Sequence, residues 1–164
     1  LGRLPGLTGR PSPFEGLAEA PPDAWRTLAA GYLEETRAAG PGAVGIAAPQ
    51  VGWFERVVIV DVSGRKKTRS HGHLILVNPE IIAWDGFAMG REGCLSVPDY
   101  TGNVVRAERI RLRAQDRDGN DLAFDMDGFE ARAVQHELDH LDGLLFLDRL
   151  VSRRQDLFQR KVYK

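Results

Sequence analysis

Residues 135–140 read Gln135-His136-Glu137-Leu138-Asp139-His140. Two histidines four residues apart lie one above the other on the same face of a helix, so their ring nitrogens can meet at one metal ion. The glutamate after the first histidine can then lie beside a water on that metal and serve as a general base. This HExxH pattern predicts a catalytic metal site. The opposing interpretation is a helix whose two histidines face solvent.

The flanking residues favour the metal site. Apolar side chains recur at helical spacing in residues 129–141, namely at Phe129, Ala133, Val134, Leu138 and Leu141. Gly143 is suited to end this helix. A helix buried on several sides brings His136 and His140 into or near the interior. Buried imidazoles need partners, and a metal ion is a suitable one.

The composition is that of an ordinary globular protein. The chain has 164 residues, of which 43% are hydrophobic and 27% charged, enough for one domain with a core. Its formal net charge of −1 gives no general attraction to nucleic acid or to anionic membranes. No apolar run approaches the roughly 18 residues of a membrane span, and no apolar segment of a secretory signal is visible. We therefore expect a single cytoplasmic domain over residues 1–164, with neither DNA nor membrane as a partner.

Cysteine and the remaining histidines give two further candidates. Cys94 is the only cysteine, so no internal disulfide can form and no oxidising compartment is needed. A free cysteine is commonly a small buried hydrophobic residue, but the glycine before Cys94 and the strand start after it favour another role. His71 and His73 fall in a polar, basic stretch. A solvated loop is favoured there over a second metal site, because no third ligand is nearby.

The first part of the chain predicts few regular elements. Residues 1–22 are rich in Pro and Gly and are expected to be irregular. Helical spacing of apolar residues predicts a helix over 23–39, which Gly40-Pro41 ends. Residues 42–52 are interpreted as a small-residue turn region, and 56–62 as a β-branched strand.

The later part predicts short strands and then helices. A loop is expected over 63–72. Strands are expected after it, at 74–77, 81–84, 104–105, 109–115 and 121–125. Asn78-Pro79 separates the first two, and Asp118-Gly119 is a turn signal. The HExxH run lies on a helix over 129–141, and 152–163 is expected to be a short C-terminal helix. Strands followed by a helix that packs on them predict an α+β fold.

A catalytic metal site needs a third protein ligand beside His136 and His140. Downstream, Asp142 is only two residues past His140 and points to a different side of the helix, whereas Asp148 is available. Upstream, Cys94 offers a thiolate, which is a strong ligand for Zn²⁺ and Fe²⁺. Cys94 is the preferred third ligand.

The chain resembles the peptide deformylase family. The resemblance covers roughly residues 40–150 and is carried by three separated motifs. They are Gly45-Ile46-Ala47-Ala48-Pro49-Gln50, Glu92-Gly93-Cys94-Leu95-Ser96 and Gln135-His136-Glu137-Leu138-Asp139-His140. The resemblance implies antiparallel β-sheets packed around a central helix that bears the HExxH run. It also implies an enzyme that removes the formyl group from the N-terminal formyl-methionine of newly made polypeptides.

The resemblance implies roles for the motif residues. Cys94, His136 and His140 would hold one divalent metal ion, Fe²⁺ as the native ion with Zn²⁺ or Ni²⁺ as alternatives. A water in the fourth position would attack the formyl carbon, and Glu137 would act as general base and then general acid. Gln50 and the backbone N–H of Leu95 would stabilise the oxyanion.

Further residues are expected to support the site or to contact the substrate. An ion pair between Glu92 and Arg106 would hold the Cys94 loop in place, and Asp139 either orients a ligand histidine or faces solvent. The peptide would lie extended along a strand edge. The residues expected around it are Val44, Gly45, Gly93, Phe129, Ala133 and His136.

Two positions depart from the family pattern. Ala43 replaces a usual glycine, which costs about 1 kcal/mol or more if that position requires positive φ. Arg132 occupies a usually apolar position near the methionine pocket, where its stem can cover apolar surface while its head reaches water.

Rival interpretations remain at this point. Arg149 to Lys164 holds six basic residues against one acidic residue, Asp156. A solvated face is favoured for this tail over contact with the ribosome surface. For the whole chain, the alternatives to a deformylase are a zinc endopeptidase with Asp148 as third ligand and a non-catalytic peptide- or ribosome-binding module.

Overall fold

The computed structural model describes residues 44–52, 54–94 and 96–160. The helical elements of this part are η2 (Ala48–Val51), α2 (Gly128–Leu141) and η3 (Phe146–Arg149). Its strands are β1 (Gly45–Ala47), β2 (Val57–Val60), β3 (Leu74–Cys94), β4 (Val97–Gln115), β5 (Asp121–Asp127) and β6 (Leu157–Gln159). The irregular segment expected over 1–22 and the helix expected over 23–39 lie outside the described residues.

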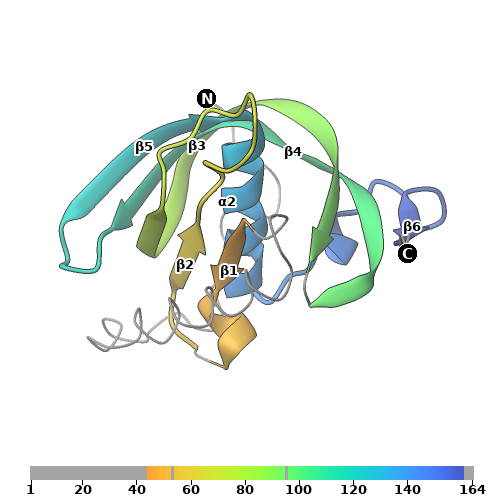
Figure 1. The fold of residues 1–164 in the computed structure, drawn as a ribbon, viewed down its shortest axis with the longest axis horizontal. Coiled ribbons are helices and arrows are strands. Elements are labelled where there is room, and N and C mark those ends of the chain that lie inside the picture. The colour runs from red at the N-terminus through yellow and green to blue at the C-terminus, as the bar shows by residue number, and fades with distance from the viewer. Residues whose placement is uncertain (1–43, 53, 95, 161–164) are drawn as a thin grey trace.

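The strands form one antiparallel sheet in the order β1-β2-β3-β4-β5, with β6 added to β4. Strands β3 and β4 form a long hairpin that closes where Cys94 pairs with Val97. In Figure 1 these two strands arch over α2, which runs through the middle of the molecule. The predicted α+β fold, with antiparallel strands around a central helix, is confirmed.

Helix α2 is fixed by its apolar side and by polar contacts, among them those of Gln135. Ala131, Val134 and Leu141 pack in the main core with the inward side chains of the sheet. The buried Gln135 side chain accepts from the Ala107 N–H at 2.9 Å and donates to the Ala107 carbonyl at 2.9 Å, as a neighbouring strand would. Among the residues that the structure describes, none of the helices has the length and apolar character that a membrane span requires.

Strand β3 is longer than the sequence pattern predicts. The strands expected at 74–77 and 81–84 are parts of one strand, as are those expected at 104–105 and 109–115. The ladder shifts register between Val77 and Glu80, where Asn78 has a φ of 49°. Such a bulge accommodates Pro79, which has no N–H to give to the ladder.

Two further expectations are wrong. Of the turn region expected over 42–52, the described residues 44–52 are not a simple turn, since Gly45–Ala47 pairs with β2. No helix forms within residues 152–160, where turns lead into β6 instead. In β6, Leu157 packs in a small cluster with Cys94, Val104 and Phe146, whereas its neighbour Phe158 stacks under the Arg91 guanidinium. This alternation of sides suits a strand and not a helix.

Candidate metal centre

Three ligand atoms meet where the end of β3 faces α2. The hairpin presents the Cys94 thiol, and α2 presents His136 and His140 from successive turns. The ligand atoms of these residues all lie within 4.8 Å of one another. Cys94 Sγ is 3.3 Å from Nε2 of His140, and the two imidazole rings stand nearly perpendicular with centroids 5.0 Å apart. The structure therefore brings together the three residues that the sequence predicts as ligands.

The electrostatics of this cluster fit a divalent cation. Burial raises the pKa of the Cys94 thiol, but hydrogen bonds with His136 and His140 outweigh burial and lower it to about 5. Burial lowers the pKa of His136, but contacts with Cys94 and Glu92 outweigh burial and raise it to about 10. The surroundings thus favour the ionised thiolate form of Cys94 and a positive charge beside it. One thiolate with two imidazoles is a donor set for Zn²⁺ or Fe²⁺.

Glu92 fixes the orientation of the His136 ring. Its Oε1 lies 2.9 Å from His136 Nδ1, which leaves Nε2 directed at the cluster. Arg106 donates from Nε and Nη2 to the two Glu92 oxygens at 3.0 and 2.9 Å, so the ion pair expected from the sequence is present. Burial raises the pKa of Glu92, but His136 and Arg106 outweigh it and hold that pKa well below its usual range. A carboxylate held in this way orients a metal-binding imidazole.

Arg132 is a second cation on Glu92, contrary to the expectation that its head reaches water. Its side chain is 12% exposed, and Nη1 donates to Glu92 Oε2 at 2.7 Å and to the Val104 carbonyl at 3.0 Å. Nη2 donates to the Ala88 carbonyl at 2.6 Å. Gly90 makes this possible, because a Cβ there would lie 2.9 Å from Arg132 Cζ. An arginine here is accommodated by a glycine on the facing strand.

Glu137 is buried beside the Cys94, His136 and His140 cluster, and one of its carboxylate oxygens has no hydrogen-bond partner in the described residues. The residue is 5% exposed, and Oε2 has no such partner among the described residues. Burial raises the pKa of this carboxyl, and the positive charge of His136 and His140 opposes that rise. The β1 backbone packs directly on it, since a Cβ on Gly45 would lie 2.8 Å from Oε1. Only glycine permits this approach.

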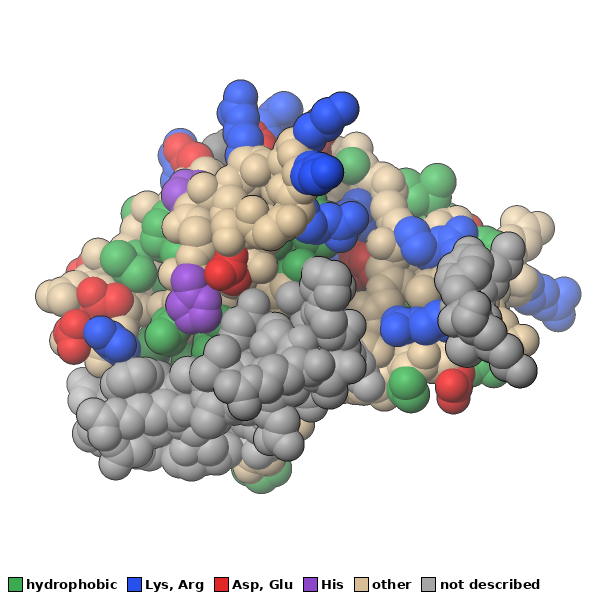
Figure 2. Space-filling view, viewed as in Figure 1, with side chains coloured by type: hydrophobic (Ala, Val, Ile, Leu, Met, Phe, Trp, Pro, Cys, Tyr) green, Lys and Arg blue, Asp and Glu red, His purple; other side chains and the backbone are tan. Residues whose placement is uncertain are grey.

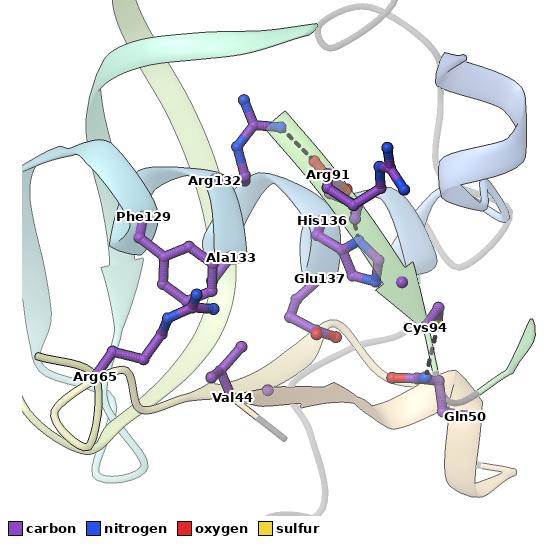
Figure 3. Close-up of a pocket in the computed structure, with 13 residues that line it drawn as sticks. Val44, Gln50, Arg65, Arg91, Cys94, Phe129, Arg132, Ala133, His136 and Glu137 are labelled. Carbon is purple, nitrogen blue, oxygen red and sulfur yellow. Dashed lines mark hydrogen bonds and ion pairs between the residues drawn. The ribbon is translucent and has the colours of Figure 1, made fainter. Parts of the chain in front are cut away.

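Gln50 reaches the cluster from η2. The Ala47 N–H donates to its Oε1 at 2.8 Å, which turns the amide nitrogen toward β3. Nε2 is 3.1 Å from Ser96 Oγ and 3.8 Å from Cys94 Sγ, a contact drawn in Figure 3. Leu95 and Ala43, which the sequence also singles out, lie outside the described residues.

A pocket opens beside these groups, and Figure 3 shows its walls. All six residues expected around the substrate line it, namely Val44, Gly45, Gly93, Phe129, Ala133 and His136. Arg65, Arg91 and Arg132 line it as well. Sequence patterns did not indicate Arg65 or Arg91, because arginines in polar stretches are normally solvated.

A sequence model of the polypeptide deformylase family matches residues 13–156. The chain belongs to the polypeptide deformylase family. Peptide deformylase 2 of Vibrio parahaemolyticus is 43% identical over 139 residues, covering 85% of this chain and 80% of its own. Peptide deformylase of Heliobacterium modesticaldum is 49% identical over 116 residues, covering 71% of this chain and 72% of its own. A crystal structure of a peptide deformylase from Legionella pneumophila has a TM-score of 0.71 at 37% identity, over 84% of this chain and 79% of that one.

The other acidic candidates of this deformylase have partners of their own. Asp142 accepts from Arg56 at 3.1 Å. Asp148 is exposed and accepts from the Leu145 N–H at 2.9 Å. Asp139 does not face solvent, because it is buried in ion pairs with Arg106 and Arg149. Neither Asp142 nor Asp148 belongs to a group of potential metal ligands in the described residues.

The second histidine pair of the enzyme does not form a metal site in the part that the structure describes. His71 Nδ1 contacts Oε1 of the buried Glu130, and His73 Nδ1 lies 3.5 Å from Asp61 Oδ2. The loop that carries both histidines has no strand or helix, as expected. The two histidines contact different carboxylates and share no group of ligand atoms.

Proposed function

We propose that this enzyme removes the formyl group from the N-terminal formyl-methionine of newly made polypeptides, releasing formate and a free amino terminus. One observation supports this most: a buried Glu137 oxygen, without a hydrogen-bond partner among the described residues, lies next to a cluster of one thiol and two imidazoles. Family membership supplies the reaction class, and this arrangement supplies the groups that such hydrolysis needs.

Cys94 Sγ and the Nε2 atoms of His136 and His140 would hold one divalent cation, with Fe²⁺ as the native ion and Zn²⁺ or Ni²⁺ as alternatives. When bound, the cation supplies Lewis acidity to water and to the formyl carbonyl. Glu92 keeps the His136 ring in place through Nδ1, and Arg106 and Arg132 keep Glu92 ionised. These contacts support a rigid ligand set.

Glu137 would carry the proton. Its Oε2 accepts a proton from the attacking water and returns it to the leaving nitrogen as the formyl C–N bond breaks. The Gln50 amide nitrogen, held toward Cys94 by the Ala47 contact, would donate to the oxyanion together with the Leu95 backbone N–H. Both donors remain neutral, so they do not compete with the ligands for the cation.

The peptide would bind as an added strand. Strand β1 is the first strand in the sheet order, so among the described strands one of its edges has no neighbour. An extended peptide can pair with such an edge. The methionine side chain would then enter the pocket between Val44, Phe129 and Ala133. Close packing of Gly45 on Glu137 leaves room for a small acyl group such as formyl.

A formate-release assay tests this function. The metal-loaded protein is incubated with formyl-Met-Ala-Ser-amide, and formate and peptide products are quantified together. We expect one formate for each peptide that gains a free amino terminus, and no internal cleavage. Internal cleavage without formate would instead support the endopeptidase alternative. Binding without either product would support a non-catalytic module.

A further inference from the structure

Arg65 is a cation at the pocket wall that has no carboxylate partner in the described residues. Its guanidinium lies over the Phe129 ring, with Cζ 3.8 Å from the ring centroid (Figure 3). Arg132 differs, because its guanidinium is bound to Glu92 and to two carbonyls. Stacking holds a guanidinium by its face and leaves its edge N–H groups available to a ligand.

The loop that carries Arg65 is tied to the fold near both ends. At its start, the Arg65 N–H donates to the Val62 carbonyl at 3.0 Å, and Asp61 accepts from Ser63 Oγ at 2.6 Å. At its end, the His71 N–H donates at 2.7 Å to Glu130, which is buried in the first turn of α2. Figure 2 shows Lys and Arg side chains along the top of this face, where Figure 1 places the loop. Arg65 is therefore positioned before any ligand arrives.

The direction of the bound peptide determines what Arg65 meets. In Figure 3 the wall runs from Cys94 past Glu137 and Ala133 to Phe129, where Arg65 lies. An extended peptide with its formyl end at Cys94 would run along this wall. Side chains two residues apart point to the same side, about 6.6–6.8 Å apart. With the first side chain against Ala133 and Phe129, the third falls beyond Phe129, at Arg65.

We propose that Arg65 makes this enzyme favour formyl peptides with an acidic side chain at the third residue. This inference rests on the proposed deformylase function. A guanidinium binds a carboxylate through two parallel N–H donors, which selects Asp or Glu over a neutral amide. The pair would be exposed, so we expect a preference of about two- to fivefold in kcat/KM. Arg91, the other pocket arginine without a carboxylate partner in the described residues, donates to Asn103 and stacks on Phe158 on the side of the cluster.

The test compares peptides that differ at one position and carry no other carboxylate. Formate release is measured with formyl-Met-Ala-Asp-Ser-amide and formyl-Met-Ala-Asn-Ser-amide. We expect the Asp peptide to have the higher kcat/KM, and the ratio to fall toward one as salt is raised. Moving Asp to the second residue should reduce the preference, because that side chain points to the opposite side.

Two variants assign the preference to the residue. Arg65→Gln should bring the Asp/Asn ratio to about one. Lys66→Gln, which removes the same charge from the next loop position outside the pocket wall, should leave the ratio unchanged. A wild-type ratio near one, or a ratio that persists in Arg65→Gln, overturns the inference while leaving the proposed function intact. No formate from either peptide overturns both.

Discussion

Replacement of Glu137 by Gln is expected to lower kcat for formate release by about 10²–10⁴-fold, while metal content per chain and thermal stability stay close to those of the unaltered protein. Glutamine has the same shape, so it can occupy the space against Gly45 that Glu137 fills. It cannot accept and return the proton that the proposed reaction moves. The loss should therefore appear in turnover and not in folding or in metal binding.

Glu130→Gln is the matched control for this variant. Glu130 is a second buried glutamate of α2, but it contacts His71 and does not line the pocket. The same substitution there should leave kcat near its normal value, even if it loosens the His71 contact. Undiminished formate release by Glu137→Gln would refute the assignment of Glu137 as the proton carrier.

Replacement of Arg106 by Met is expected to lower the free energy of unfolding by about 3–5 kcal/mol. The Arg106 side chain is 1% exposed and joins Glu92 to Asp139, two carboxylates that are themselves buried. Removing one partner of a buried ion pair leaves charge in a medium that solvates it poorly, and this cost exceeds the gain from the apolar replacement. Urea unfolding followed by circular dichroism measures the change.

Arg111→Met on the same strand is the control. Arg111 pairs with Asp125, but their side chains are 51% and 72% exposed. Water solvates both charges when the pair is broken, so stability should change little. If both variants lower the free energy of unfolding equally, burial does not determine how much the Arg106 ion pairs contribute to stability.

The helix and its ligands are predictable from sequence because both follow local rules. His136 and His140 share a face whenever residues 129–141 are helical, and the apolar spacing of Ala133, Val134 and Leu138 predicts that helix. The observed helix, Gly128–Leu141, agrees to within one residue at its start. Cys94 could be chosen as the third ligand from its chemistry and from the resemblance, without knowledge of the hairpin that carries it.

The long strands are not predictable in the same way, because partners far along the chain stabilise them. Residues 85–93 contain three glycines and exposed charges, which locally disfavour a strand. Pairing with β4 nevertheless extends β3 to Cys94. The wrong prediction of a C-terminal helix has the same origin. The open side of β4 pairs with Leu157–Gln159, and this pairing overrides any helical tendency. Tertiary pairing decides both segments.

The side chains around the pocket show a second limit of sequence reasoning. The direction of Arg132 depends on Gly90, which lies more than forty residues earlier and on another element. A glycine that faces a larger residue indicates where the larger side chain is directed. This pairing is recognisable only once the register of β3 is known. Likewise, Arg65 belongs to a basic loop that would be read as solvated, and only the fold places it over Phe129.

X-ray absorption spectroscopy of the metal-loaded protein tests the central claim most directly. With Zn²⁺ bound, we predict one sulfur at about 2.3 Å and two histidine nitrogens at about 2.0–2.1 Å. Cys94→Ala should lose the sulfur signal and most of the bound metal, whereas Asp148→Ala should change neither. A spectrum of the unaltered protein without sulfur, or one that Cys94→Ala leaves unchanged, would contradict the account.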